Sequence, residues 1–485
     1  MPKFVPGRRF RDAAGNVTTM YALLAPILVF GTGAAIDYGR AAQMHSKLNA
    51  AADAAALAAL TPNMLQQTNA VAQAAAVSLF QGLTNGLPSL SNTTVTVTVT
   101  PGSNPLVRTV AVQYSTQVST IFAAVLGRSS LPVQGTAQAT ARIPPNIDFY
   151  VLLDNSPSMA LPATTAGITK MQSLTAKQDS GNGCAFACHQ ASTNNGDSAG
   201  NPCADGTAPT QSGNLYCAAS HGAQLDNYAL ARKNSISLRL DELTTGISTL
   251  LQTASSTASS SQFSTPPAYR FSIYSMDSLW SVGLTQLVPL TSDYVNQWAN
   301  NTSKFGVMEM YSNNNLCTTA ACTAGGSTSP SGDVATNFDD SLGKLSQASY
   351  VPAPGNGTNQ SGDTPQKVLF IVTDGVEDEL YNGSRLEEAI NNLGNAPDGN
   401  SSTTNWCTTI KNRGIKIAVL YTDYLPVPLN SWYNSKISPI QSSIAPALQA
   451  CASPGLFYDA AIGADLGAAL STLFAAVTQS GHLTN

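Results

Sequence analysis

The sequence is poor in charged residues. Only 11% of its 485 residues are Asp, Glu, Lys or Arg, which is less than half of the ~25% that is usual in soluble globular domains. This shortage excludes a coiled-coil rod and a polyampholyte tail. The 23 basic and 28 acidic residues give a net charge of −5. A nucleic acid is therefore not an expected partner, because its phosphate backbone attracts basic surfaces.

Histidine is also scarce, and this limits the enzyme classes that the chain can supply. It has only four histidines, and no G-x-S-x-G motif follows an expected strand, so a serine nucleophile lacks an evident base. No P-loop or G-x-G-x-x-G motif follows an expected strand. An aspartyl phosphatase would need a second aspartate two residues after Asp154, where Ser156 stands. We expect a binding protein without a small-molecule substrate, not an enzyme.

Cysteine is absent from the first 183 residues. The eight cysteines all lie further along the chain: Cys184, Cys188, Cys203, Cys217, Cys317, Cys322, Cys407 and Cys451. An even set beyond an apolar segment indicates disulfides in an oxidising compartment. Cys407 and Cys451 lie on the expected helices before and after a strand at 416–422. Neighbouring helices on one face of a sheet can bring two cysteines together, so we predict this pair and leave the other six open.

One long stretch without charge is present near the N-terminus. Residues 17–36 are twenty residues without a charged side chain, which as a helix cover the ~30 Å of a bilayer core. A cleavable signal peptide is the alternative, but its apolar region would be only ~7–15 residues long. Here the apolar run passes directly into an Ala-rich helical pattern that continues to residue 60. We therefore expect a retained transmembrane anchor.

The charges around this segment indicate its orientation. Four basic residues precede it, namely Lys3, Arg8, Arg9 and Arg11, and Asp37 follows it. Basic residues stay on the cytoplasmic side of a bacterial membrane. We expect a single-pass inner-membrane protein with its N-terminus in the cytoplasm and its bulk in the periplasm.

Residues 61–144 have the pattern of a small α+β unit. A helical pattern runs from Thr61-Pro62 to about Leu83 and is followed by alternating stretches at 93–100 and 107–114, which predict a hairpin. A short helical segment at 120–127 and a final alternating stretch at 133–141 complete the unit. Pro144 and Pro145 mark its end.

Residues 146–485 have a different pattern. Short apolar, β-branched and aromatic runs predict strands that are buried on both faces, at 147–153, 269–276, 367–373 and 416–422. Helical patterns alternate with them, at 228–254, 293–300, 337–346, 403–412, 440–451 and 466–479. This alternation predicts an α/β domain with a doubly wound, mostly parallel sheet. The polar segment 164–224, with four of the cysteines, is expected to be an inserted loop held by disulfides.

Oxygen-bearing side chains follow two of the expected strands. Strand 147–153 leads into Asp154, Ser156 and Ser158, strand 367–373 leads into Asp374, and Thr336 stands at an expected helix start. In a doubly wound sheet these positions meet at the carboxyl edge. Two carboxylates and three hydroxyls, with no nitrogen or sulfur, suit Mg²⁺, or else Ca²⁺ or Mn²⁺, better than zinc. We predict a divalent-cation site made by these five residues.

The segment DNSPS, with TN at a helix start and TDG after a later strand, resembles the metal-ion-dependent adhesion site (MIDAS) of von Willebrand factor type A domains. The resemblance implies that Asp154, Ser156, Ser158, Thr336 and Asp374 surround the cation. It also implies an open coordination position for an acidic group of a partner.

The N-terminal segment 11–59 resembles TadG-like proteins of the Tad (Flp) pilus assembly system, as do GCAFACH at 183–189 and the C-terminal HLTN. Related pseudopilins carry a glutamate five residues beyond a processed glycine, but that position after Gly15 is Met20, so we expect no such cleavage. The resemblance implies assembly or anchoring of a pilus, with pilus-assembly or envelope proteins as partners. A metal-independent envelope scaffold and a released cell-surface adhesin remain the alternatives.

Overall fold

The chain divides into two compact units, with the main division after Ile143. The computed structural model describes residues 14–102, 105–178, 181–185, 201–208, 210–212, 214–216, 219–221, 225, 227–276, 284–305, 336–358, 361–381, 384–389, 405–431, 433–461 and 463–478. Outside these residues lie the expected basic stub, parts of the insertion 164–224, the C-terminal HLTN, and Cys188, Cys217, Cys317 and Cys322.

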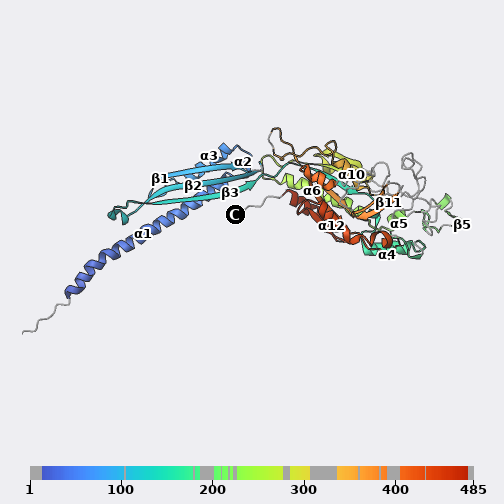
Figure 1. Ribbon diagram of the computed structural model, residues 1–485, viewed down its shortest axis with the longest axis horizontal. Coiled ribbons are helices and arrows are strands. Elements are labelled where there is room, and N and C mark those ends of the chain that lie inside the picture. Colours follow the sequence, from blue (N-terminus) through green and yellow to red (C-terminus); the bar gives the residue numbers. More distant parts are fainter. Residues whose placement is uncertain are drawn as a thin grey trace, which may run out of the picture. The chain divides into compact units, whose positions relative to one another are not determined.

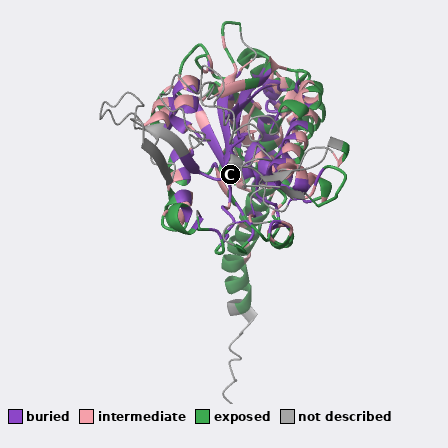
Figure 2. Ribbon diagram, turned by 90° about the vertical axis from the view of Figure 1, so that its right-hand side faces the viewer, coloured by how far each residue is buried: buried purple, intermediate pink, exposed green. Residues whose placement is uncertain are grey.

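The first unit begins with one long helix, α1 (Ala14–Ala58). Its 45 residues correspond to a length of about 68 Å. The helix is long and apolar enough to cross a membrane, and only 6% of the residues in its most apolar stretch are buried. The exposed part of α1 is the green helix at the bottom of Figure 2. Apolar side chains such as those of Ile27 and Leu28 are largely exposed among the described residues, as in a helix that faces lipid.

The second half of α1 packs onto a small sheet. Its buried residues recur every three or four positions, at Asp37, Ala41, Met44, Leu48, Ala51, Ala52, Ala55 and Ala56. This spacing forms one helical stripe. The stripe contacts the antiparallel sheet of β1 (Leu90–Pro101), β2 (Val107–Ser119) and β3 (Ser130–Arg142). In β2 every second side chain from Val110 to Val118 is buried, so one face of the sheet supplies the core of this unit.

Two sequence expectations for this unit need correction. The single helix expected from Thr61 to Leu83 is two helices, α2 (Pro62–Leu65) and α3 (Asn69–Thr84). The guanidinium of Arg108 donates to the carbonyls of Met64 and Gln67 at 2.5 and 2.6 Å, and it thereby ends α2 with a contact from a distant strand. The helical segment expected at 120–127 is the 3₁₀ turn η1 (Ala123–Leu126). The hairpin and the last strand of this unit are confirmed.

The second unit is built on a six-stranded sheet with the order β13-β12-β9-β4-β7-β8. The strands are β4 (Ile147–Asp154), β7 (Tyr269–Met276), β8 (Leu284–Thr291), β9 (Gln366–Thr373), β12 (Lys416–Thr422) and β13 (Phe457–Ala460). All neighbours are parallel except β7 and β8. Every residue of β4 is buried, so both faces of the central sheet are covered.

The helices around this sheet form two groups. One group is α6 (Arg239–Ser259), α7 (Tyr294–Asn301) and α13 (Leu466–Thr478), in which α6 contacts both α7 and α13. Phe149 of β4 stacks on Phe271 of β7 at 4.6 Å between ring centroids and meets Phe474 of α13 at 5.4 Å. The other group is α10 (Phe338–Leu345), α11 (Trp406–Asn412) and α12 (Gln441–Cys451). Figure 1 labels α6, α10 and α12 from these two groups.

All four strands predicted for this unit are present, and the edge strands are additional. β8 contains Pro289 and β13 has only four residues, so neither has the long apolar run of a central strand. The helix expected at 228–254 is α5 (Asn227–Lys233) and α6, separated by Ser235 at a φ of 53°. The expected loop 164–224 begins with a helix, α4 (Thr165–Leu174), which buries Ile168 and Met171.

Several short elements complete the described part of this unit. They are the hairpins β5 (Thr210–Ser212) with β6 (Asn214–Tyr216) and β10 (Val376–Tyr381) with β11 (Ser384–Ala389), the 3₁₀ turns η2 (Pro157–Ala160), η4 (Ala219–His221) and η5 (Thr302–Lys304), and the π-helix η6 (Tyr433–Ile437). Of these, η2 matters most here, because it follows the end of β4.

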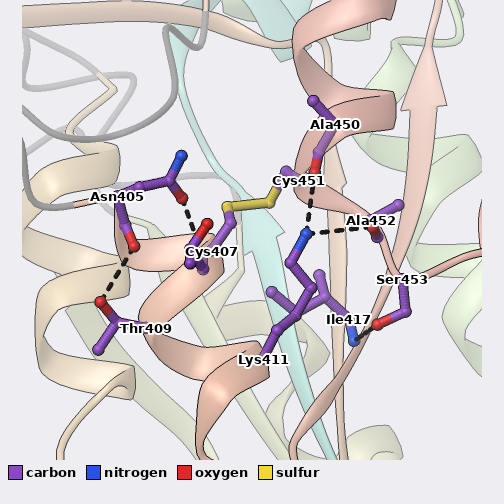
Figure 3. The surroundings of a disulfide bond; sticks show 10 residues. Asn405, Cys407, Thr409, Lys411, Ile417, Ala450, Cys451, Ala452 and Ser453 are labelled. Atoms are coloured by element: carbon purple, nitrogen blue, oxygen red, sulfur yellow. Dashed lines mark hydrogen bonds between the residues drawn. A yellow bond between two sulfur atoms is a disulfide. The ribbon is translucent and has the colours of Figure 1, made fainter.

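A disulfide joins α11 to α12. Cys407 and Cys451 are bonded, with their Cα atoms 5.1 Å apart, which confirms the predicted pair. Figure 3 shows the Lys411 ammonium beside it, where it donates to the carbonyls of Ala450 and Ala452 at 2.9 and 3.4 Å. The end of α12 is therefore held by a covalent bond and by a cation that satisfies its last carbonyls.

Removing this disulfide lowers the stability of the second unit. The bond spans 44 positions of the sequence, and loss of a cross-link over a loop of this size costs about 2–4 kcal/mol because the unfolded chain gains freedom. The double variant C407S/C451S is compared with wild type by urea unfolding. All four tryptophans lie between residues 280 and 432, so their fluorescence follows the second unit. An unchanged unfolding midpoint would contradict the prediction.

The carboxyl ends of β4 and β9 as a candidate cation site

Two neighbouring parallel strands deliver acidic residues to one edge of the sheet. β4 ends at Asp154, β9 ends at Thr373, and Leu153 pairs with Val372 in the register. Asp154 and Asp374 therefore leave the sheet side by side. This is the edge where ligands bind in open α/β sheets.

The loop after β4 folds back onto its own aspartate. The Ser156 N–H donates to Asp154 Oδ1 at 2.9 Å, and the Thr373 hydroxyl donates to Asp154 Oδ2 at 2.5 Å. The hydroxyl oxygens of Ser156 and Ser158 lie 2.8 Å apart. Asp154 and Ser156 are buried, whereas Ser158 is half-buried. The two serine hydroxyls thus lie together between a buried carboxylate and the surface.

Asp374 has one oxygen without a hydrogen bond. Its Oδ1 accepts from the Val376 N–H at 3.3 Å, whereas Oδ2 is buried and has no hydrogen-bond partner in the described part of the chain. Gly375 makes the turn after it with a φ of +75°, and an added Cβ would lie 2.5 Å from the Ile444 side chain. This turn therefore requires glycine, both for its backbone conformation and for the close approach of α12.

Burial makes the two carboxylates costly to charge together. Burial and the nearby Asp154 raise the pKa of Asp374 to about 7, against the opposing effects of Arg239 and Ser158. Burial also raises the pKa of Asp154, although hydrogen bonds from Ser156 and Thr373 favour its charged form. When both are charged, two close carboxylates in a low-dielectric site repel each other. A cation bound at this edge would offset that repulsion.

A buried arginine supplies part of this positive charge, and the sequence analysis did not identify it. Arg239 Nη1 lies 3.9 Å from Asp374 Oδ2, and its Nη2 donates to the carbonyl and the hydroxyl of Thr422. Arg239 is the first residue of α6, where the helix dipole disfavours a cation. A basic residue in the first turn of a helix was therefore the signal that could have identified it.

The structure brings together four of the five predicted residues. Asp154, Ser156, Ser158 and Asp374 form one cluster. Thr336 is buried directly before α10, but no hydrogen bond among the described residues joins it to the other four. The segment 306–335, which leads to Thr336, lies outside the described residues. Thr373, which binds Asp154 directly, is a further polar residue that the sequence analysis did not include as a ligand.

The cluster fits a hard divalent cation better than a soft one. Its donors are all oxygens, and one carboxylate oxygen is buried without a hydrogen bond, as a metal ligand is before the metal binds. Among the described residues no three His, Cys, Asp or Glu side chains gather as a possible metal site. A cation here would depend on two carboxylates and neighbouring hydroxyls.

Comparisons with known proteins connect the N-terminal segment to a pilus system. Residues 15–77 match the family described as "Putative Flp pilus-assembly TadE/G-like". This match runs from the start of α1 into the first half of α3 and supports the resemblance of that segment to TadG-like proteins. None of the curated proteins matches the chain.

Similar solved structures include two of the pilus adhesin SpaC from Lactobacillus rhamnosus GG. One, an open conformation, is 12% identical with a TM-score of 0.33, and the match covers 80% of this chain and 34% of SpaC. The PilB minor pilin from Streptococcus sanguinis is 10% identical with a TM-score of 0.29, covering 80% and 77%. This chain therefore spans about a third of the length of SpaC. Likenesses this weak carry no conclusion about function.

Proposed function

We propose that the chain is a membrane-anchored envelope protein that serves the assembly or anchoring of a Tad-type pilus. The match of residues 15–77 to the TadE/G-like pilus-assembly family carries this proposal. The length and apolar surface of α1 support a membrane anchor, and the basic residues before it favour a cytoplasmic N-terminus. The second unit then lies in the periplasm, where disulfides such as Cys407–Cys451 form.

The proposed role of the second unit is to bind a partner through a divalent cation, preferably Mg²⁺. The D-x-S-x-S spacing after β4, the parallel sheet and the all-oxygen cluster support a von Willebrand A-like domain with an adhesion site. Asp154, Ser156, Ser158 and Asp374 would hold the cation, with Thr336 as the fifth predicted ligand. A cation held by only two carboxylates retains affinity for another acidic oxygen, which a partner's Asp or Glu supplies. The role is binding, without catalysis.

The residues of the site have distinct tasks in this proposal. Thr373 and the Ser156 N–H hold the Asp154 carboxylate in one orientation. Asp374 contributes the oxygen that accepts no hydrogen bond among the described residues, and half-buried Ser158 lies where a partner's side chain can approach. Arg239 stabilises the two carboxylates when the cation is absent.

Deletion of the coding sequence in its own organism tests the pilus role. We expect the deletion to remove surface pili, and wild-type protein supplied in trans to restore them, because an assembly protein is needed before any subunit reaches the surface. Pili are measured in sheared surface fractions and by electron microscopy. The variant Asp374→Asn and its matched control Asp293→Asn, at the exposed start of α7, are supplied in the same way.

Each outcome separates the candidate functions. Restoration of pili by Asp293→Asn but not by Asp374→Asn supports cation-dependent partner binding. Restoration by both variants indicates a metal-independent scaffold. Normal pili in the deletion strain would contradict the pilus role, and wild-type protein found outside the membrane fraction would favour a released adhesin.

A further inference from the structure

A small apolar surface lies on the turn between β2 and β3. Ile121, Val125 and Leu126 are 57%, 74% and 64% exposed. We call these three residues the η1 surface. Three large apolar side chains on one short turn are costly in water, and no side chain of the described residues covers them to any large extent.

This turn is fixed to the membrane-spanning part of the chain by a buried carboxylate. Asp37 accepts hydrogen bonds from three consecutive backbone N–H groups, those of Ile121, Phe122 and Ala123, at 2.8–2.9 Å. The carboxylate is 3% exposed. Asp37 directly follows the uncharged segment 17–36. The η1 surface therefore lies beside the end of that segment.

The contact extends beyond Asp37 into the apolar segment itself. Gly33 is buried, and a Cβ added to it would lie 2.5 Å from the ring of Phe122. Gly33 continues the buried stripe of α1, four positions before Asp37 and eight before Ala41. Ile36 is three residues past Gly33, so Phe122 packs about 4–5 Å inside the end of the apolar segment, at 1.5 Å per residue.

We propose that the η1 surface inserts into the outer face of the same lipid bilayer that α1 crosses. The proposal rests on α1 as a membrane anchor, which is part of the proposed function. If residues 17–36 span the hydrocarbon core, then side chains packed at the level of Gly33 lie close to the outer boundary of that core. The exposed side chains of Ile121, Val125 and Leu126 then face lipid and not water.

The polar groups of the turn suit this location. The backbone N–H groups of Val125, Gly127 and Arg128 are bonded to carbonyls of the same turn, and Asp37 satisfies the three before them. Backbone groups near lipid must be satisfied within the protein. Arg128 is exposed after the turn, and Tyr38, the residue after Asp37 on α1, is 73% exposed. Arginine and tyrosine are favoured at the headgroup level.

The consequence is a second attachment of the first unit to the membrane. A single helix leaves a domain free to tilt and turn, whereas the η1 surface adds a second contact at a fixed distance from α1. The sheet of β1 to β3 is then held at the membrane surface in one orientation.

A photoactivatable benzophenone amino acid at position 126 tests the insertion. The full-length protein is reconstituted into vesicles of phosphatidylethanolamine and phosphatidylglycerol, and cross-links to lipid are measured by mass spectrometry. The matched control carries the same group at Val71, which is exposed near the start of α3. We expect a lipid cross-link yield at position 126 at least about tenfold above that at position 71, because the side chain reaches the acyl boundary.

A pair of glycine variants tests whether the insertion depends on the contact between Gly33 and Phe122. Gly33→Ala forces Phe122 away from α1, whereas Gly31→Ala meets nothing within 4 Å. We expect Gly33→Ala to lower the lipid cross-link yield at position 126 severalfold and Gly31→Ala to leave it unchanged. Far-ultraviolet circular dichroism, to which the sheet of β1 to β3 contributes, shows whether each variant folds.

Flotation of the vesicles separates this proposal from the anchor on which it rests. Protein that floats but gives equal lipid cross-linking at 126 and 71 would overturn the insertion while leaving the anchor intact. Cross-links from position 126 to protein instead of lipid would overturn it in favour of a protein partner. Protein that does not float would show that α1 is not an anchor and would overturn both.

Discussion

The variant Asp374→Asn abolishes saturable binding of Mg²⁺ and Mn²⁺ by the full-length protein. We expect an affinity loss of at least about a hundredfold, since even residues that only support a metal ligand contribute 10–100-fold. The amide removes the negative charge from a buried carboxylate oxygen of the cluster that has no hydrogen bond among the described residues. Calorimetry measures Mg²⁺ binding in detergent, and electron paramagnetic resonance measures Mn²⁺.

The matched control is Asp293→Asn, an equal loss of charge at an exposed position of the same unit. It is expected to bind both ions as wild type does. Saturable binding that survives in Asp374→Asn would show that the cation site lies elsewhere or does not exist. The same conclusion holds if wild type binds neither ion.

Metal binding by wild type weakens as the pH falls below about 7. The metal-free pKa of Asp374 is raised to about 7 by burial and by Asp154, and only the deprotonated carboxylate binds a cation. Below that pH a bound proton competes with the metal, so affinity decreases with each unit of pH. Above it the competition ends and affinity levels off.

The variant Asp148→Ala gives the largest expected loss of stability. Asp148 lies in β4 between Arg270 of β7 and Lys367 of β9, its partners in the strand register. Its carboxylate accepts from Lys367 at 2.5 Å and from Arg270 at 2.7 and 2.8 Å. Lys367 is 4% exposed. Removing the carboxylate leaves its ammonium buried without its partner, at a cost of about 3–5 kcal/mol.

Urea unfolding followed by tryptophan fluorescence measures this loss. Two further variants show its cause. The double variant D148L/K367M removes both charges and should recover most of the stability, because no buried charge remains unpaired. Arg270→Ala should cost ~1 kcal/mol or less, because that side chain is 43% exposed and water replaces its partner. A double variant no more stable than Asp148→Ala would contradict this explanation.

Local patterns in the sequence predicted most of the elements. The four central strands 147–153, 269–276, 367–373 and 416–422 were predicted within a residue or two, because strands buried on both faces are continuous apolar runs. The pairing of Cys407 with Cys451 followed from the same topology. The edge strands β8 and β13 were not predicted, since a half-exposed or four-residue strand has no such run.

Where the predictions were wrong, a distant residue decided the local structure. Arg108 ends α2 from a strand more than forty positions away, and no pattern within 61–83 contains that contact. Arg239 belongs to the site because the start of α6 lies beside the ends of β9 and β12. Its position in the sequence, inside the expected helix 228–254, gives no indication of a contact with Asp374.

The sequence by itself determined the apolar segment 17–36, the two-part organisation and the positions of the four central strands, because these depend on periodicity and composition along neighbouring residues. Only the tertiary structure decided which polar groups meet. It placed Arg239 against the two carboxylates, left one oxygen of Asp374 without a hydrogen bond, and packed Phe122 on Gly33. Such contacts depend on strand register and on side-chain direction between segments that are far apart in the chain, and these are properties that no local pattern encodes.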